Sequence, residues 1–166
     1  SANTFCSVSP TKAEHVEKQL NGKIDGVVDG GACSVGVEST IVGFANEGVQ
    51  ILREGGVPRR DIESVLNCKV DEVHAKTEHT PGSLKKHYAP DVPLSILEDE
   101  AWLSQVSTST GFITLSPVQV ANKHVVNFPL TTTGDLSEAA KNVYQVLHDI
   151  SEANVSKAYV QLVPNE

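Results

Sequence analysis

The chain has 166 residues, of which 39% are hydrophobic, so it can bury one good core or two small ones. No apolar run is long enough to span a bilayer, and we therefore expect no membrane association. A formal net charge of −8 argues against a protein that grips a nucleic-acid backbone through bulk positive charge, although a local pocket for one nucleotide needs only a few donors.

The first part of the chain predicts a small mixed α/β unit. Ser9 and Pro10 suit a helix N-cap and first helical position, and Asn21-Gly22 suits a helix end. Residues 46–48 separate two apolar runs and predict a hairpin turn. In chain order we expect a helix over 10–20, strands over 24–29, 37–44 and 49–53, and a helix over 58–66 with Ile62, Val65 and Leu66 facing inward.

The pattern fades over 74–92, where prolines and polar residues indicate a linker and a domain boundary. Residues 93–166 then alternate strands with helices, which predicts a parallel, doubly wound sheet. This second domain contains no GxGxxG fingerprint, and we interpret it as structural or as an anchor for the linker. We expect strands over 94–97, 111–115, 124–128 and 158–163, a short helix over 99–106, and a long helix capped by Asp135 and Glu138 with an apolar stripe of Leu136, Ala139, Ala140, Val143, Leu147 and Ile150.

The cysteines and histidines limit which cellular compartment and which metal chemistry we expect. Cys6, Cys33 and Cys68 are odd in number and form no CxxC pair, which favours free thiols in a reducing compartment, and we expect a cytoplasmic protein. The six histidines show no HExxH pattern and no paired spacing with carboxylates, so we predict no intrinsic metal site. The chain starts at Ser1 without a methionine, which is compatible with a missing upstream part.

Three polar strings in the first 53 residues are the candidate site. They are Ser1-Ala2-Asn3 with Ser9-Pro10-Thr11, then Gly36-Val37-Glu38-Ser39-Thr40, then Ile51-Leu52-Arg53. Their small hydroxyls, amide and guanidinium can hydrogen-bond a polar ligand without filling its space, and the glycine pairs beside them allow the backbone to approach closely.

Two of these residues suit phosphate on chemical grounds alone. Thr11 is expected near a helix N-terminus, where backbone N–H groups favour anions, and Arg53 at a strand end can hold phosphate oxygens in a bidentate fork. The alternatives stay open, because Thr11 can simply support the helix cap and Arg53 can pair with Glu38 or Glu54 on the surface. The string from Pro81 to Pro90 contains donors and the aromatic Tyr88, and is either a lid or a solvated linker.

The strings occur in the order SANxxxxxSPTxAEHV, IDxVxDGGxCSVGVESTIV, ILRxGG and PGxxxxHYAP. In order and spacing they resemble the YrdC-type threonylcarbamoyl-AMP synthases, and more narrowly the long form with an extra C-terminal α/β domain. The resemblance covers nearly the whole chain and is strongest over residues 1–92. It implies that 1–73 is the C-terminal part of a YrdC-like catalytic domain, 74–92 a lid-like linker, and 93–166 a Rossmann-like domain.

The family reaction joins L-threonine, bicarbonate and ATP into threonylcarbamoyl-AMP and pyrophosphate, which downstream proteins use to modify tRNA. Such chemistry relies on positioning and charge neutralisation, so no protein nucleophile is expected. Mg²⁺ would arrive with ATP. By resemblance, Ser1 and Ser39 contact threonine, and ATP is contacted by Asn3, Thr11, Arg53 and Tyr88.

The chain also departs from the family pattern. Cys6 stands where the family usually has glycine, and Gly43 stands where aspartate is common. The family's N-terminal half, with its basic phosphate contacts, is absent, so we expect the chain alone to be inactive and prone to form a homodimer. The alternative is a truncated, non-catalytic module that binds a nucleotide, RNA or a partner, although the acidic charge weighs against RNA.

Overall fold

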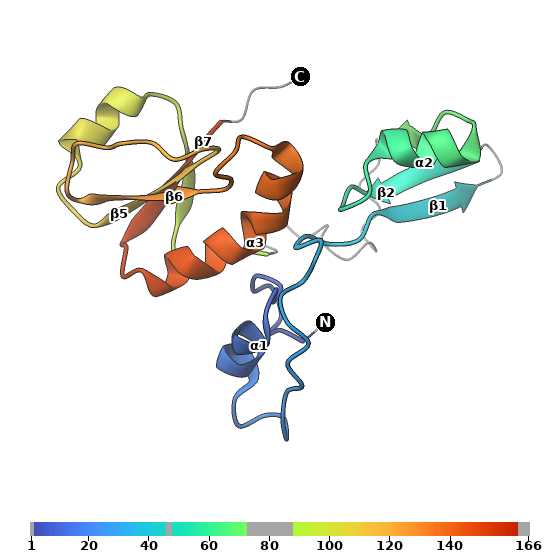
Figure 1. Ribbon diagram of the computed structural model, residues 1–166, viewed down its shortest axis with the longest axis horizontal. Helices are drawn as coiled ribbons and strands as arrows, with labels where there is room; N and C mark the ends of the chain where they lie inside the picture. The colour runs from blue at the N-terminus through green and yellow to red at the C-terminus, as the bar shows by residue number, and fades with distance from the viewer. Residues whose placement is uncertain (1, 46–47, 73–87, 163–166) are drawn as a thin grey trace.

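The computed structural model describes residues 2–45, 48–72 and 88–162, which form the three lobes seen in Figure 1. One lobe holds α1, a second holds β1, β2 and α2, and the third holds the C-terminal sheet. The elements, in order, are α1 (Ala13–Leu20), β1 (Ile41–Ala45), β2 (Gly48–Arg53), α2 (Arg59–Leu66), β3 (Asp71–Glu72), β4 (Leu94–Leu97), the 3-10 helix η1 (Glu100–Gln105), β5 (Thr110–Thr114), β6 (Val125–Pro129), α3 (Leu136–Glu152) and β7 (Lys157–Gln161).

The C-terminal sheet confirms the predicted parallel α/β architecture. Its strand order is β4-β7-β5-β6, and every pairing is parallel. Helix α3 covers one face, where Ile113, Val146 and Ile150 share a buried core, and η1 covers the other face around Phe112. Helical elements on both faces are what makes the sheet doubly wound.

Helix α3 begins as predicted at its N-cap but not through a complete capping box. The Asp135 carboxylate accepts the Glu138 N–H at 2.7 Å. Glu138 does not return the bond, because its carboxylate accepts from the hydroxyls of Thr131 and Thr133 instead. Of the predicted apolar stripe, Ala139 and Ile150 are buried and Leu136 is 45% exposed.

The predicted hairpin is present, with β1 and β2 antiparallel and β3 parallel to β2. Its first strand starts at Ile41 and not at residue 37. The reason is local: the Thr40 hydroxyl donates to the Val57 carbonyl at 2.7 Å and accepts the Val57 N–H at 3.1 Å, which ties this residue to the segment after β2.

Other predictions for this half are wrong. Residues 25–40 contain neither helix nor strand, although a strand was expected over 24–29, and Val28 there is 97% exposed. The first helix begins at Ala13, after Lys12, because the Ser9 hydroxyl bonds the Glu38 carboxylate at 2.5 Å and does not cap the helix. The apolar face of α2 is not inward, since Val65 is 85% exposed.

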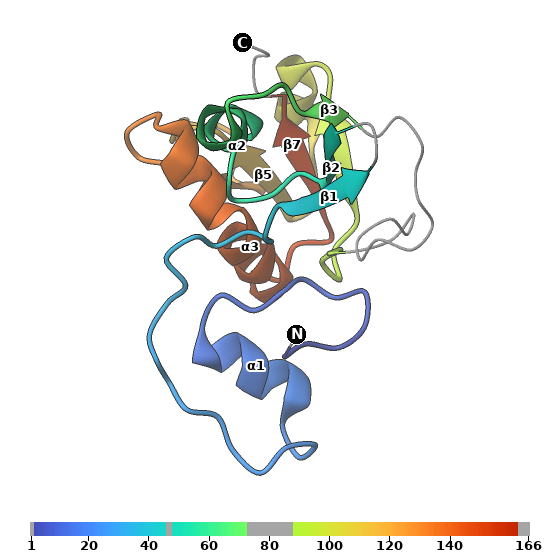
Figure 2. The same ribbon diagram turned by 90° about the vertical axis from the view of Figure 1, so that its right-hand side faces the viewer.

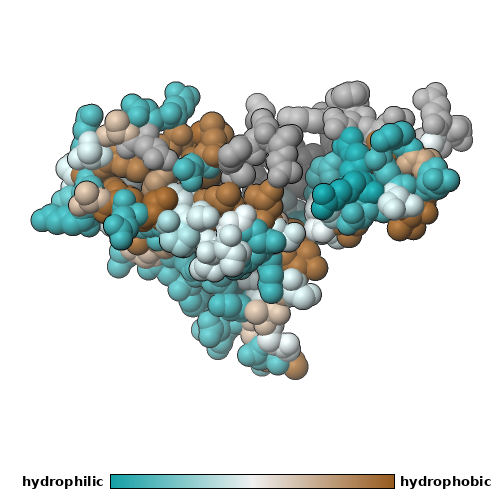
Figure 3. Space-filling view, turned by 45° about the horizontal axis from the view of Figure 1, so that its top comes forward, coloured by the Kyte–Doolittle hydropathy of each residue, from teal (hydrophilic) through white to brown (hydrophobic). Residues whose placement is uncertain are grey.

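Within the described ranges, no helix has both the length and the apolar character that crossing a membrane requires. Apolar side chains are nevertheless exposed on the lobe of β1, β2 and α2. Figure 3 shows apolar residues at the edge of that lobe as well as on the C-terminal lobe. The exposed members on the hairpin lobe are Phe44, Val57, Val65 and Leu66.

Candidate functional site

Arg53, at the end of β2, brings three of the predicted site residues together. Its Nε and Nη2 donate to the Ser39 carbonyl at 3.2 and 2.7 Å, and Nη2 also reaches the Ser39 hydroxyl at 3.1 Å. Nη1 donates to the Tyr88 hydroxyl at 3.3 Å. The guanidinium therefore bridges the segment before β1 and the residues that precede β4, which lie 14 and 35 positions away in sequence.

Glu38 extends this cluster toward the first polar string. Its Oε2 lies 3.7 Å from Arg53 Nη2, and its Oε1 accepts the Ser9 hydroxyl at 2.5 Å. The pair is largely shielded, with side chains 28% and 17% exposed for Glu38 and Arg53. The sequence left open a pairing of Arg53 with Glu38 or Glu54. Arg53 lies beside Glu38, whereas Glu54 pairs with Arg59 at 2.8 Å.

A cavity of about 480 Å³ opens beside Glu38. Its wall comes from both parts of the chain, because Tyr144 of α3 faces the loops of the first part. Burial, then the nearby Glu38 charge, raises the pKa of Tyr144, so its phenol keeps its proton. The lining residues are Ala2, Ser9, Pro10, Thr11, Cys33, Ser34, Val35, Gly36, Val37, Glu38 and Tyr144.

Tyr88 links this cavity to the Arg53 cluster. Its ring stacks on Tyr144, with centroids 5.6 Å apart and planes inclined by 30°. Burial, reinforced by Glu38 and opposed by Arg53, raises the pKa of the Tyr88 phenol. The next residue, Ala89, donates its N–H to the Cys6 carbonyl at 3.2 Å, so residues 88–89 also contact the first loop.

Thr11 lines the cavity and is itself buried, with 6% of its surface exposed. Its N–H donates to His15 Nδ1 at 3.1 Å, and its hydroxyl donates to Gln145 Oε1 at 3.4 Å. The Thr11 carbonyl accepts the Cys33 N–H at 2.8 Å. Thr11 therefore joins three segments. It is not the N-cap of α1, because Lys12 occupies that position.

Asn3 lies in the loop that precedes Thr11. Its Nδ2 donates to the Thr4 and Ser7 carbonyls at 3.0 and 3.4 Å. Its Oδ1 is buried and has no partner among the described residues. The predicted threonine contact Ser1 lies outside the described residues, and so do the residues of the predicted linker that precede Tyr88.

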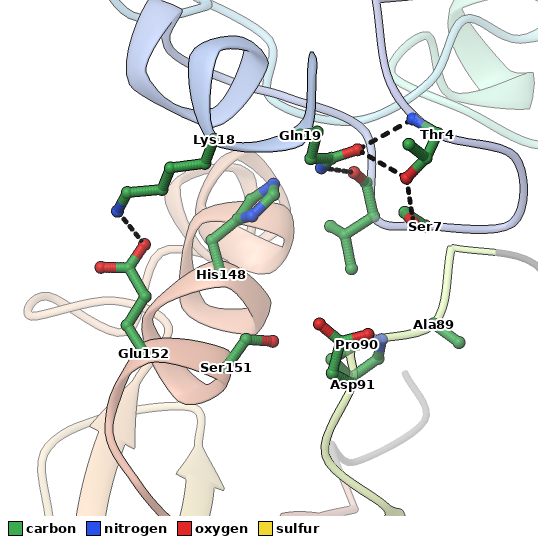
Figure 4. A pocket seen from close by; sticks show the side chains of 11 residues that line it. Thr4, Ser7, Lys18, Gln19, Ala89, Pro90, Asp91, His148, Ser151 and Glu152 are labelled. Carbon is green, nitrogen blue, oxygen red and sulfur yellow. Dashed lines mark hydrogen bonds and ion pairs between the residues drawn. The ribbon is translucent and has the colours of Figure 1, made fainter. Parts of the chain in front are cut away.

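A second cavity, of about 410 Å³, lies where α1, α3 and residues 89–91 meet (Figure 4). Lys18 of α1 forms an ion pair with Glu152 of α3 at 2.5 Å. Gln19 reaches into the first loop, where its Oε1 accepts the Thr4 N–H at 3.0 Å. This cavity marks the junction between the first loop and the C-terminal domain.

Sequence reasoning missed Tyr144 and the bridging position of Glu38. Tyr144 lies on a helix whose apolar stripe was the visible signal, and its tertiary neighbours are more than 50 positions away in sequence. Among the described residues, no group of three or more His, Cys, Asp or Glu side chains is arranged to hold a metal ion.

Two family models match the chain. The model described as threonylcarbamoyl-AMP synthase, C-terminal domain, matches residues 57–166, and a model described as telomere recombination matches residues 1–55. The division between the two matches falls earlier than the boundary predicted at 74–92, which stays a prediction.

Relatives and solved structures agree with this. The threonylcarbamoyl-AMP synthase of Bacillus subtilis is 43% identical over 102 residues, which are 59% of this chain and 30% of that protein. The corresponding protein of Pyrococcus abyssi is 36% identical over 103 residues, again 59% and 30%. The crystal structure of P. abyssi Sua5 complexed with L-threonine superposes with a TM-score of 0.74 at 27% identity, covering 99% of this chain and 52% of that one. The chain thus spans about half of the solved relative.

Proposed function

This chain belongs to the threonylcarbamoyl-AMP synthase family, and from that premise we propose that it forms one wall of a site that makes threonylcarbamoyl-AMP. The reaction would join L-threonine, bicarbonate and ATP and release pyrophosphate. The observation that carries the proposal is the convergence of Ser39, Arg53 and Tyr88 beside a cavity lined by Thr11 and Glu38.

The proposed roles follow from the donors that each residue presents. The threonine amine and bicarbonate form a carbamate with loss of water, and a carbamate oxygen then attacks the α-phosphate of ATP while pyrophosphate leaves. Arg53 would hold phosphate oxygens with its fork, whose Nη atoms are kept in one orientation by the neutral oxygens of Ser39 and Tyr88. Such a step needs charge neutralisation and alignment more than a protein nucleophile.

The remaining contacts are proposed on the same basis. Asn3 and Thr11 would contact ATP, and Asn3 has a buried Oδ1 without a partner in the described chain, which suits a ligand N–H. Ser1 and Ser39 would contact threonine, the ligand with which the P. abyssi relative was crystallised. Mg²⁺ would enter bound to the ATP phosphates, as it usually does in such sites.

Partners and compartment are proposals of the same kind. The product would be consumed by proteins that modify tRNA, and the free Cys6, Cys33 and Cys68 are consistent with a cytoplasmic location. The exposed Phe44 and Val65 on the hairpin lobe are consistent with self-association into a homodimer.

The test is threonine- and bicarbonate-dependent release of pyrophosphate from ATP. The assay compares the 166-residue chain alone with the chain mixed with the part of the B. subtilis relative that it does not match. Turnover in the mixture, above either component, supports the proposal. Nucleotide binding without turnover in any combination would favour the alternative, a non-catalytic binding module.

A further inference from the structure

One face of α3 carries the contacts between the C-terminal domain and the candidate site. Lys141, Tyr144, Gln145, His148 and Glu152 recur at the three- and four-residue spacing of a helical face. Figures 1 and 2 both show α3 beside the segment that carries α1. The opposite face, with Ala139, Val146 and Ile150, is buried in the domain's own core. This outward face is called the α3 platform below.

Two of the three polar strings rest on the α3 platform. Gly36 packs so closely on it that an added Cβ would lie 1.9 Å from the Lys141 carbonyl oxygen. The Thr11 hydroxyl donates to Gln145 Oε1 at 3.4 Å, and His148 Nε2 meets the Ser9 carbonyl at 3.1 Å. The platform therefore contacts the first and second polar strings directly.

Tyr144 is the platform residue nearest to the proposed chemistry. It lines the cavity of about 480 Å³ beside Glu38, and its ring stacks on Tyr88 with the ring centroids 5.6 Å apart. Tyr88 in turn meets Arg53, and Arg53 holds Ser39. Tyr88 has a left-handed backbone with φ of 53°, a conformation that a non-glycine residue keeps only where its surroundings enforce it.

We propose that Tyr144 is a positioning residue: it holds the Tyr88 ring so that the Tyr88 hydroxyl meets Arg53, and the C-terminal domain thereby sets the geometry of the ligand-binding cluster. The ring, and not the hydroxyl, does this work, because aromatic stacking fixes the direction of the Tyr88 hydroxyl. The expected effect of Tyr144 on ligand binding rests on the proposed function, whereas its expected effect on the position of Tyr88 does not.

The first experiment needs no ligand. Hydrogen exchange at the Ala89 amide, which donates to the Cys6 carbonyl, reports whether the segment after Tyr88 is held in place. Y144A and Y144L should each speed exchange at Ala89 by about tenfold, while Y144F should keep the wild-type rate. The matched control is Y159A, which removes a tyrosine ring of the same domain that packs on Trp102, and it should leave Ala89 unchanged.

The second experiment measures ATP affinity by calorimetry, with the same four variants in the complete protein. Y144A and Y144L should weaken binding by about tenfold, and Y144F by less than about twofold. The inference would be overturned if Ala89 exchanged at the wild-type rate in both folded Y144A and folded Y144L. It would also be overturned if Y159A weakened ATP binding as much as Y144A does. Faster exchange at Ala89 with no ATP binding by any protein, wild type included, would support the positioning role and count against the proposed function.

Discussion

Arg53 is the residue on which the charge of the candidate site depends. Its side chain is 17% exposed, and the Glu38 carboxylate lies 3.7 Å from Nη2. At that distance the ion pair is loose, so Nη1 and Nη2 stay oriented toward neutral oxygens of Tyr88 and Ser39. A fork held in this way is already aligned to bind a phosphate through two parallel hydrogen bonds.

We predict that R53A weakens ATP binding by about 1.5–3 kcal/mol, the usual scale of a hydrogen bond to a charged group. R53K should lie between, because lysine keeps the charge and loses the planar fork. Calorimetry of the complete protein measures this. The matched control is R60A, since Arg60 is 85% exposed and pairs only loosely with Asp61 at 3.5 Å. Unchanged affinity in folded R53A would remove Arg53 from the site.

For Glu38 we predict an effect on the ionisation of the two stacked phenols, Tyr88 and Tyr144. Burial raises the pKa of both Tyr88 and Tyr144, and the Glu38 charge is the next cause for each. E38Q keeps an oxygen for the Ser9 hydroxyl but removes the charge, so both phenols should ionise at lower pH. Absorbance of phenolate during an alkaline titration measures the change. E54Q is the control, because Glu54 is 58% exposed and pairs with Arg59; an identical titration of E38Q and wild type would contradict the prediction.

At the scale of elements, sequence reading works where an element depends on its own residues and near neighbours. The strands β4 to β7 start within one residue of their predicted positions, because short apolar runs between polar turns are typical of a parallel sheet, and β5 is buried at every position. It fails where tertiary contacts decide. Ser9 bonds Glu38, 29 positions away, and so does not cap α1. Val27 and Val28 read as strand residues but have no strand beside them in the described chain.

The same distinction explains the candidate site. Ser39 and Arg53 could be selected as candidate site residues from the sequence, because they stand in short polar strings and because hydroxyl and guanidinium groups suit an anionic ligand. Their meeting with Tyr88 was not readable, since it depends on residues 35 positions apart. Tyr144 could not be found at all, because a helix sequence does not say what its outward face contacts.

Gly36 provides the element-scale prediction, since it sets how the second polar string docks on α3. Its φ of 78° is left-handed, and an added Cβ would lie 1.9 Å from the Lys141 carbonyl oxygen. Gly22 has nearly the same conformation, with φ of 72°, but open space around its Cβ position. The two glycines therefore differ in packing and hardly in backbone conformation.

We expect G22A to lower the free energy of unfolding by about 1–2 kcal/mol, the cost of a left-handed alanine. G36A should lower it by about 1–3 kcal/mol more, because the added methyl also overpacks the contact with α3. Urea denaturation of both variants and wild type measures the difference. Equal destabilisation would show that the loop does not dock on α3 as described.

At the scale of the whole molecule, the junction of α1 with α3 contains a stacked pair of histidines, of which His15 is buried. The rings of His15 and His148 stack with centroids 3.7 Å apart and planes inclined by 21°. His15 is 3% exposed, and its Nδ1 accepts the Thr11 N–H at 3.1 Å, which requires that nitrogen to be unprotonated. Burial, then the charges of His148 and Lys12, lowers the pKa of His15 to about 4, against an opposing effect of Glu152.

This lowered pKa predicts how the stability of the junction depends on pH. Above pH 6.5, the ordinary pKa of histidine, neither the folded nor the unfolded chain protonates His15, and the junction keeps its full stability. As the pH falls from 6.5 toward 4, the unfolded chain binds a proton that the folded chain refuses, so stability is lost at up to about 1.4 kcal/mol per pH unit. Below pH 4 both states are protonated and this contribution stops changing.

Between pH 7 and pH 5 the loss from His15 should therefore be about 1–2 kcal/mol. Urea denaturation at the two pH values, at constant ionic strength, measures it. H15Q removes the titrating ring, and its stability should change less than that of wild type over the same interval. K12A is the finer test, because Lys12 helps to lower the pKa of His15, so its removal should reduce the pH dependence without removing the ring. If wild type and H15Q lose the same stability between pH 7 and pH 5, the buried His15 does not couple protonation to the docking of α1 on α3.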